Sequence, residues 1–218
     1  MSRPPEPTPD PAPSLVIGLS GGIASGKSAV ARLLAGEHGV VIDADRLAHE
    51  ALASEEVRAL VRERFGAQVF DAEGAVDRAA LAREVFSHPD QRAVLEGWIH
   101  PRVRVSMTRR LEESRARNVP RIVLDVPLLF ENDDQHQLTR ECDVLVFVDA
   151  SKETRAARVA ENRGWERDEL SRREACQASL DEKRKRSDHV IQNDGDLEQL
   201  EAAVRRLDQV LESRGRTP

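Results

Sequence analysis

Five short apolar runs alternate with longer stretches whose hydrophobic residues recur every three to four positions. The runs lie at 15–19, 40–42, 122–124, 143–149 and 190–191. They consist mainly of Val, Ile and Leu, which is typical of strands buried on both faces of a parallel sheet. The last stretch begins near Asp196 and predicts a helix with one core-facing side: Leu197, Leu200, Val204, Leu207 and Leu211. The pattern predicts an α/β fold, with a five-stranded parallel sheet flanked by helices.

Two stretches between the predicted strands are longer than a crossover connection requires. Residues 46–117 favour helix nearly throughout and predict an inserted helical domain, with Pro101 in the first turn of a restarted helix. Residues 152–187 are dense in arginine and lysine among many acids, which is typical either of a solvated helix surface or of a lid. The predicted core comprises residues 14–45, 118–151 and 188–218. Residues 1–13 contain six prolines and predict a disordered leader.

Composition narrows the classes of function. The 218 residues carry a net charge of −6, which argues against nucleic acid as the main partner. No apolar run approaches the roughly 18 residues that a membrane span needs, and the N-terminus lacks the apolar segment of a signal peptide. The two cysteines show no metal-binding or Cys-x-x-Cys spacing. We therefore expect a cytoplasmic protein with a small-molecule substrate, as a monomer or small homo-oligomer.

The strongest motif follows the first predicted strand. Residues 21–28 fit the phosphate-binding pattern G-x-x-x-x-G-K-[ST], and a helical pattern begins at its last residue. The glycines let backbone N–H groups face one anion, and the helix N-terminus adds the positive end of its dipole. Lys27 can reach the outer phosphates of a nucleoside triphosphate, and Ser28 can bind Mg²⁺. We expect this loop to bind ATP through Gly21, Gly22, Ile23, Ala24, Ser25, Gly26, Lys27 and Ser28.

Carboxylates follow two of the predicted strands. Asp43 and Asp45 come directly after the second strand, on the side where doubly wound sheets bind ligands. Asp45 fits both an N-cap of the next helix and a catalytic base, while Asp43 is better placed to bind backbone or the metal shell. Asp125 ends the third strand, where it fits either a Mg²⁺ ligand or a carboxylate bonded to backbone.

The predicted lid offers candidates for contacting the transferring phosphate: Arg163, Arg173 and Arg158. At helical spacing Arg173 shares one stripe with Gln177, Leu180 and Arg184. A closing lid would bring such cations onto the phosphoryl group.

Five pieces of the sequence, in this order, resemble the dephospho-coenzyme A kinase family. They are residues 19–28, 41–45, 99–102, 126–131 and 188–193. The family transfers the γ-phosphate of ATP to the ribose 3′-hydroxyl of dephospho-CoA, the last step of coenzyme A synthesis. It has a phosphate-loop core, a helical acceptor domain and a lid. The resemblance covers nearly everything after residue 14.

The resemblance implies roles for the matching residues. Asp45 is the expected base, Asn193 lies in the loop near the adenine, and Lys27 and Ser28 contact ATP and Mg²⁺. The expected acceptor-binding residues are Ser20, Asp45, His100, Arg102, Pro127 and Leu128. The chain departs from the family pattern at Ala24, where Gly is frequent, and at Asn162, where Arg is common and Arg163 stands next to it.

Two other classes of protein share parts of this pattern. A nucleoside monophosphate kinase is disfavoured by the Asp-Ala-Asp of residues 43–45 and by the His-Pro-Arg of residues 100–102. A GTP-dependent switch protein would use a D-x-x-G motif, which residues 71–74 match. However, the sequence contains no N-K-x-D motif, and residues 71–74 follow a predicted helix rather than a strand.

Overall fold

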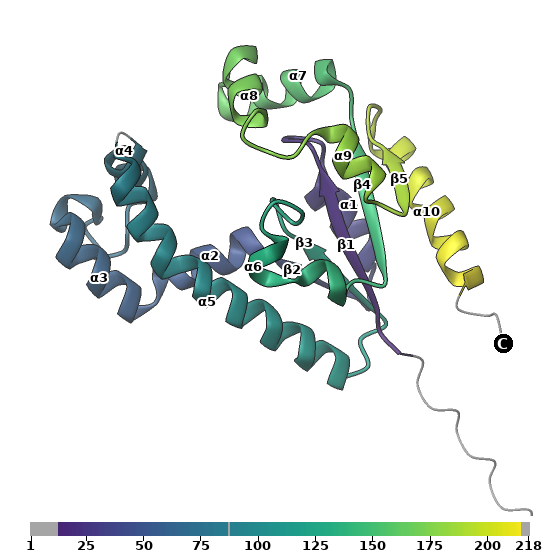
Figure 1. Cartoon of the computed structure of the whole chain (residues 1–218), viewed down its shortest axis with the longest axis horizontal. Coiled ribbons are helices and arrows are strands. Elements are labelled where there is room, and N and C mark those ends of the chain that lie inside the picture. Colours follow the sequence, from purple (N-terminus) through teal and green to yellow (C-terminus); the bar gives the residue numbers. More distant parts are fainter. Residues whose placement is uncertain (1–12, 87, 215–218) are drawn as a thin grey trace, which may run out of the picture.

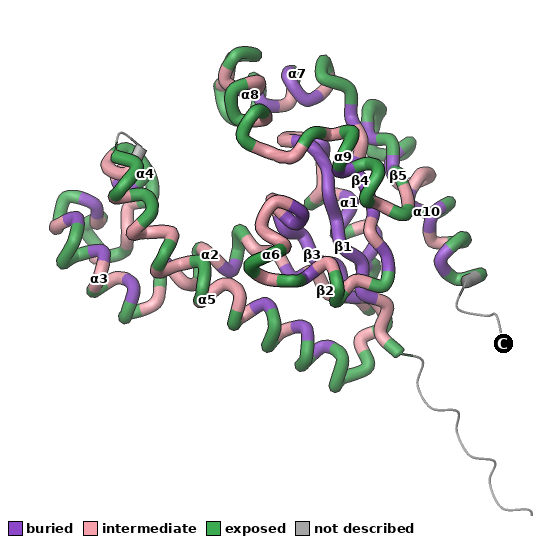
Figure 2. Tube along the Cα trace, in the orientation of Figure 1, coloured by how far each residue is buried: buried purple, intermediate pink, exposed green. Residues whose placement is uncertain are grey.

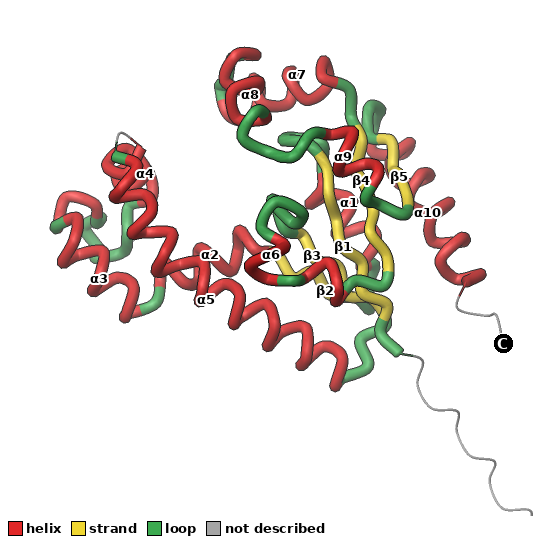
Figure 3. Tube along the Cα trace, viewed as in Figure 1, coloured by secondary structure: helices red, strands yellow, loops and turns green. Residues whose placement is uncertain are grey.

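The computed structural model describes residues 13–86 and 88–214. The predicted leader therefore lies outside the described residues, except for Pro13. The predicted strands form one parallel sheet in the order β2-β3-β1-β4-β5 (Figures 1 and 3). Their bounds are β1 (Leu15–Gly21), β2 (Val40–Asp43), β3 (Arg121–Asp125), β4 (Val144–Asp149) and β5 (His189–Gln192).

Helices fill the connections between the strands. The α-helices are α1 (Lys27–Ala35), α2 (Ala44–Ala53), α3 (Glu55–Phe65), α4 (Arg78–Phe86), α5 (Pro89–Ala116), α6 (Asp133–His136), α7 (Lys152–Arg163), α8 (Arg167–Glu174), α9 (Leu180–Lys185) and α10 (Leu197–Arg214). Two short 3₁₀ helices are η1 (Ala67–Val69) and η2 (Leu138–Glu141). None of the described helices has the length and apolarity to cross a membrane.

The two faces of the sheet carry separate parts of the core. On β1, Ile17 and Leu19 pack with Val30 of α1 and Leu200 of α10 on one face. Val16 packs on the opposite face, in the cluster that includes α5 residues. Because both faces are buried, the strands need no alternating polar positions, and their apolar runs are continuous. Figure 2 shows this buried centre between the more exposed outer helices.

One predicted core position is wrong. Leu197 keeps 62% of its surface exposed, whereas the other four apolar positions predicted on this helix face are buried. Leu197 is the first residue of α10, one turn before Leu200 reaches the core cluster. The hydrophobic periodicity of a helix predicts which of its faces is buried, but not at which turn the contacts with the core begin.

Residues 44–116 form what we call the helical arm, which extends to the left of the sheet in Figure 1. It has its own apolar cluster, which includes Val57, Val61 and Phe65, and Trp98 packs edge-on against Phe65 at 6.2 Å between ring centroids. This cluster holds the outer part of the arm together, whereas the C-terminal part of α5 packs on the sheet through Met107 and Leu111. The helices predicted between residues 46 and 117 are therefore present.

Pro101 does not restart a helix, contrary to the prediction, because α5 is one helix that runs through it. A proline lacks the N–H group and presses its ring against the carbonyl four residues earlier. That residue is Gly97, around which no side chain crowds. Nearby, the guanidinium of Arg102 donates to the carbonyl oxygen of Trp98 at 2.8 Å.

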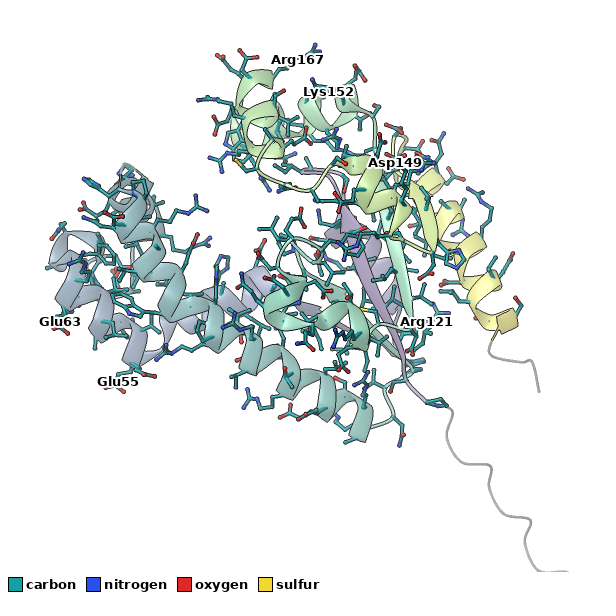
Figure 4. All side chains as sticks on the ribbon, viewed as in Figure 1. Glu55, Glu63, Arg121, Asp149, Lys152 and Arg167 are labelled. Carbon is teal, nitrogen blue, oxygen red and sulfur yellow. The ribbon has the colours of Figure 1, made fainter. Side chains whose placement is uncertain are left out.

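Residues 152–185 form what we call the arginine-rich arm, whose first helices lie at the top of Figure 1 and carry the labelled Lys152 and Arg167 in Figure 4. The predicted single stripe is wrong, because α8 ends at Glu174 and α9 begins only at Leu180. Ser179 caps α9 by accepting from the backbone N–H of Glu182 at 3.1 Å, which fixes the new start. Arg184 turns to Asp149 instead, at 2.7 Å.

Candidate active site

The phosphate loop, residues 21–28, connects β1 to α1 and adopts a curled backbone. Gly26 has a φ of 93° and Ala24 a φ of 59°, both in the left-handed region. This conformation explains why glycine is frequent at the position of Ala24, since a β-carbon is disfavoured there. A β-carbon on Gly26 would lie 2.1 Å from the side-chain nitrogen of Asn193, so this position requires glycine.

Two residues predicted as ligand contacts brace the loop from behind. The buried Asn193 donates from Nδ2 to the carbonyl oxygen of Ser25 at 2.7 Å. Arg158 donates to the carbonyl oxygens of Ala24 and Ser25, both at 3.3 Å, and to that of Asn193 at 2.9 Å. Neither Asn193 nor Arg158 lines the cavity in front of the loop. Their hydrogen bonds hold the loop backbone in shape.

A cavity of about 600 Å³, the first cavity, lies in front of the phosphate loop. It brings together the loop, the ends of β2 and β3, the helical arm and the arginine-rich arm. Its lining comprises Ile23, Ala24, Ser25, Gly26, Lys27, Ser28, Ala29, Asp43, Asp45, Arg92, Asp125, Pro127, Leu128, Arg163, Trp165, Arg173, Cys176 and Gln177. The predicted loop residues from Ile23 to Ser28 all face this cavity.

Lys27 and Asp125 form the charged floor of the first cavity. Lys27 Nζ donates to the carbonyl oxygen of Gly22 at 3.1 Å, and burial lowers the pKa of Lys27 to about 8. The hydroxyl of Ser28 donates to Asp125 Oδ2 at 2.6 Å. Burial raises the pKa of Asp125, although this hydrogen bond acts in the opposite direction. Asp125 thus bonds to a side chain of the phosphate loop.

The Ser28 and Asp125 pair fits a magnesium ion. Both residues present oxygen, the ligand that Mg²⁺ prefers, and their hydrogen bond already places the two oxygens together. Within the described residues, no group of three or more His, Cys, Asp or Glu side chains could hold a metal. Mg²⁺ commonly takes one or two protein ligands and completes its shell with waters and substrate phosphates.

Asp43 and Asp45 have different environments. Asp43 is the N-cap of α2, and its Oδ1 accepts from the backbone N–H of Arg46 at 3.0 Å. The alternative in which Asp45 caps this helix is therefore wrong. Asp45 is exposed in the first turn of α2, where its side chain lines the first cavity.

A second cavity of about 210 Å³ adjoins the same carboxylate. Asp45, Pro127 and Leu128 line both cavities. The rest of its lining comes from the helical arm and from the segment that follows β3: Ala44, Ala48, His100, Val103, Arg104, Met107, Val126, Asn132, Gln135 and His136. Its surface is mainly apolar with polar groups among the lining residues, the composition of a pocket for an organic ligand.

Two of the predicted acceptor-binding residues lie elsewhere. Arg102 forms an ion pair with Glu56 and donates to the carbonyl of Trp98, so it ties α5 to α3 rather than lining either cavity. Ser20 is buried, and its hydroxyl lies 3.0 Å from the hydroxyl of Ser187. Both residues lie beside or within a sequence motif, but their side chains contact structural partners.

The arginine-rich arm brings Arg163 and Arg173 to the first cavity. Their guanidinium carbons lie 4.8 and 4.1 Å from the ring centroid of Trp165, which holds both cations against one indole. Asn162 instead donates to the carbonyl of Arg158 at 2.9 Å and does not line the cavity. Of these two neighbours, only Arg163 lines the first cavity.

Sequence reasoning missed Arg92 and Trp165. Arg92 reaches the first cavity from α5 and lies 2.7 Å from Glu96, so in the sequence it looks like an ordinary surface pair. Trp165 follows a charged helix without a periodic signal. Only the tertiary arrangement brings them to the phosphate loop.

The D-x-x-G of residues 71–74 belongs to a turn in the helical arm. Asp71 Oδ1 accepts from the backbone N–H of Ala75 at 2.7 Å, beside an antiparallel bridge between Phe70 and Val76. These residues do not line the first cavity. The motif match is thus explained by turn chemistry.

The chain is similar to dephospho-CoA kinases over most of its length. The model of the dephospho-CoA kinase family matches residues 15–199. A dephospho-CoA kinase of Symbiobacterium thermophilum is 41% identical over 191 residues, covering 87% of this chain and 78% of that protein. One of Corynebacterium glutamicum is 38% identical over 194 residues, covering 88% of this chain and 95% of that protein.

Solved structures agree with these similarities. The crystal structure of a Thermus thermophilus protein, 38% identical, superposes with a TM-score of 0.68 and covers 92% of this chain and 97% of that one. A dephospho-CoA kinase from Campylobacter jejuni has the same fold, with a TM-score of 0.68 at 20% identity, and covers 91% of this chain and 97% of that one. With the family model matched along most of its sequence, the chain belongs to the dephospho-CoA kinase family.

Proposed function

We propose that this chain transfers the γ-phosphate of ATP to the ribose 3′-hydroxyl of dephospho-CoA where the first and second cavities meet. The observation that carries the proposal is that Asp45 lines both cavities. One cavity contains the phosphate loop, and the other is a mainly apolar pocket beside it. A phosphoryl donor in the first and an alcohol acceptor in the second would meet at this carboxylate.

In this proposal Asp45 is the catalytic base. A ribose hydroxyl is a poor nucleophile at neutral pH, and a positioned carboxylate can accept its proton as the oxygen attacks phosphorus. The bond from the γ-phosphorus to the bridging oxygen breaks, and ADP leaves. The exposed position of Asp45 in the first turn of α2 supports the role, since no capping bond engages its carboxylate.

The negative charge that develops on the phosphoryl group is stabilised by cations around the first cavity. Lys27 lies at the loop, while Arg163 and Arg173 come from the arginine-rich arm. Ser28 and Asp125 would hold Mg²⁺, which when bound neutralises charge on the phosphates. In this reading residues 152–187 act as a lid and residues 46–117 as the acceptor domain.

The second cavity suits the adenosine end of the acceptor, whose ribose carries the reacting hydroxyl. Ala48, Val103 and Met107 offer an apolar surface for a flat base, and His100 offers a polar group. Pro127 and Leu128 stand at the border between the two cavities. They would then pack on both substrates.

A coupled ADP-release assay with dephospho-CoA, AMP and CMP offered side by side tests the proposal. We expect turnover with dephospho-CoA alone, and phosphorus NMR of the product should place the new phosphate on the ribose 3′-oxygen. Equal or faster turnover of AMP or CMP would assign the chain to the nucleoside monophosphate kinases instead. Slow GTP hydrolysis without any acceptor activity would favour a switch protein.

A further inference from the structure

Lys183 of α9 is a lysine whose side chain is only 2% exposed. Its Nζ lies 2.7 Å from Oε1 of Glu131, a residue in the segment after β3. The same Nζ donates to Gln177 Oε1 at 3.0 Å. The same Glu131 oxygen accepts from the backbone N–H of Ala178 at 3.1 Å. A buried ammonium is costly unless it is paired and hydrogen bonded, and here both conditions hold.

These contacts orient the amide of Gln177. An ammonium has only donors, so the atom of Gln177 that faces Lys183 must be the acceptor oxygen. The two N–H donors of the amide therefore point to the other side. Gln177 lines the first cavity together with the phosphate loop, and the hydrogen bond from the N–H of Ala178 to Glu131 fixes the backbone beside it.

The ammonium of Lys183 has three N–H donors, and Glu131 satisfies only one of them. The second acceptor comes from a residue that faces the phosphate site, on the non-helical segment between α8 and α9. Lys183 is also close enough to Lys27 for their repulsion to contribute to the lowered pKa of Lys27. The buried network thus lies directly beside the phosphate-binding machinery.

We propose that Gln177 donates its amide N–H groups to the transferring phosphoryl group, and that Lys183 and Glu131 are positioning residues that aim it. This inference rests on the proposed function, because it requires the terminal phosphates of ATP to occupy the first cavity. The neutral amide of Gln177, held in place by the buried Lys183–Glu131 pair, would add one preorganised contact to those of the exposed Arg163 and Arg173.

Gln177→Glu separates orientation from donation. A carboxylate still accepts from Lys183 at nearly the same shape, but it has no N–H groups for a phosphate. We expect an unchanged melting temperature, a kcat about 10²-fold lower, and KM values for ATP and dephospho-CoA within about threefold of wild type. Gln177→Met, which removes the donors without adding a charge, should lower kcat to a similar extent.

Lys27→Ala assayed alongside separates this inference from the proposed function. If Lys27→Ala is inactive while either Gln177 variant keeps kcat within about threefold of wild type, the role of Gln177 is wrong and the phosphate site stands. Impairment of Gln177→Glu without impairment of Gln177→Met would trace the loss to the added charge and also overturn the inference. If Lys27→Ala remains active, the phosphate site fails, and the role of Gln177 fails with it.

Discussion

The phosphate loop and the arginine-rich arm face the same cavity but are built in opposite ways. The loop is braced from behind by the buried Asn193 and by Arg158, which bond its backbone carbonyls. The arm carries a small cluster with the buried Ala156, Val159 and Leu170, and its cavity-facing arginines are exposed. One side of the site is fixed by hydrogen bonds to buried groups, and the other presents exposed arginines held only by surface contacts with Trp165 and, for Arg173, Glu169.

The two sides differ in the free energy that is lost when their groups become ordered around the transition state. Fixed backbone donors need no rearrangement when charge develops on the phosphoryl group. An exposed arginine gives up rotamer freedom worth up to about 2 kcal/mol when it becomes ordered. We therefore expect substitutions at the core side of the site to lower the rate more than substitutions in the arginine-rich arm.

Asp45→Asn should have the largest effect. Asparagine keeps the shape of the side chain but cannot accept the hydroxyl proton, so kcat should fall by about 10²–10⁴-fold. The affinity for ATP and the melting temperature should stay close to wild type. Asp77→Asn is the matched control, because Asp77 accepts backbone N–H bonds at the start of α4, outside both cavities. A variant that melts, or that only binds ATP more weakly, would make Asp45 a structural or metal-shell residue.

Lys27→Ala should come next, with kcat lower by about 10³-fold and the fold intact. Lys27 is the buried cation of the phosphate loop, and no neighbouring lysine on the same loop can replace it. Lys152→Ala, at the exposed start of α7, controls for the loss of one positive charge. A kcat within a few-fold of wild type would mean that Lys27 does not stabilise the transition state. It would also contradict the expectation that core substitutions lower the rate more than substitutions in the arm.

Arg163→Ala and Arg173→Ala should each lower kcat/KM by about 10- to 100-fold, less than the core variants. Arg167→Ala is the control, since Arg167 is an exposed residue of the same arm that does not line the first cavity. Double-mutant analysis of Arg163 and Arg173 should show coupling, because both lie against Trp165. Small, equal effects at all three positions would mean that the arm only presents solvated charge.

The pH dependence should produce the smallest effect. In the protein without bound nucleotide the pKa of Lys27 is about 8, so kcat/KM for ATP should decline above that pH. Bound phosphates would keep Lys27 protonated, so kcat should stay constant to higher pH. Stability changes in the other direction. Between about 8 and the ordinary pKa of 10.5 the unfolded chain binds more protons at this lysine, so its contribution to stability rises with pH. A level kcat/KM profile across this range would contradict the assignment.

The same contrast explains what the sequence could and could not predict. The strands, their parallel arrangement and the phosphate loop follow from local patterns, since each apolar run is a buried strand and residues 21–28 fit a loop motif. Asp45 was found because strand ends gather at one edge of a parallel sheet. These features depend on residues that are close together in the chain.

The outcomes in the two arms depend on contacts between distant segments. Arg102 matched a motif but pairs with Glu56. In the core, Asn193 likewise matched a motif but bonds to the backbone of the phosphate loop. Arg92 reaches the cavity only because α5 crosses beside it. The side chain of an arginine or an asparagine can form hydrogen bonds with many different partners. Which partner it contacts depends on the packing of distant segments, not on the local sequence.

The claim that the core binds ATP and the helical arm binds the acceptor is tested most directly by calorimetric titration of Ala48→Trp. Ala48 lines the second cavity but not the first, so an indole there fills only the proposed acceptor pocket. We predict that dephospho-CoA loses most of its affinity while ATP binds as in wild type. Undiminished binding of dephospho-CoA to this folded variant, or loss of ATP binding in its place, would contradict the account.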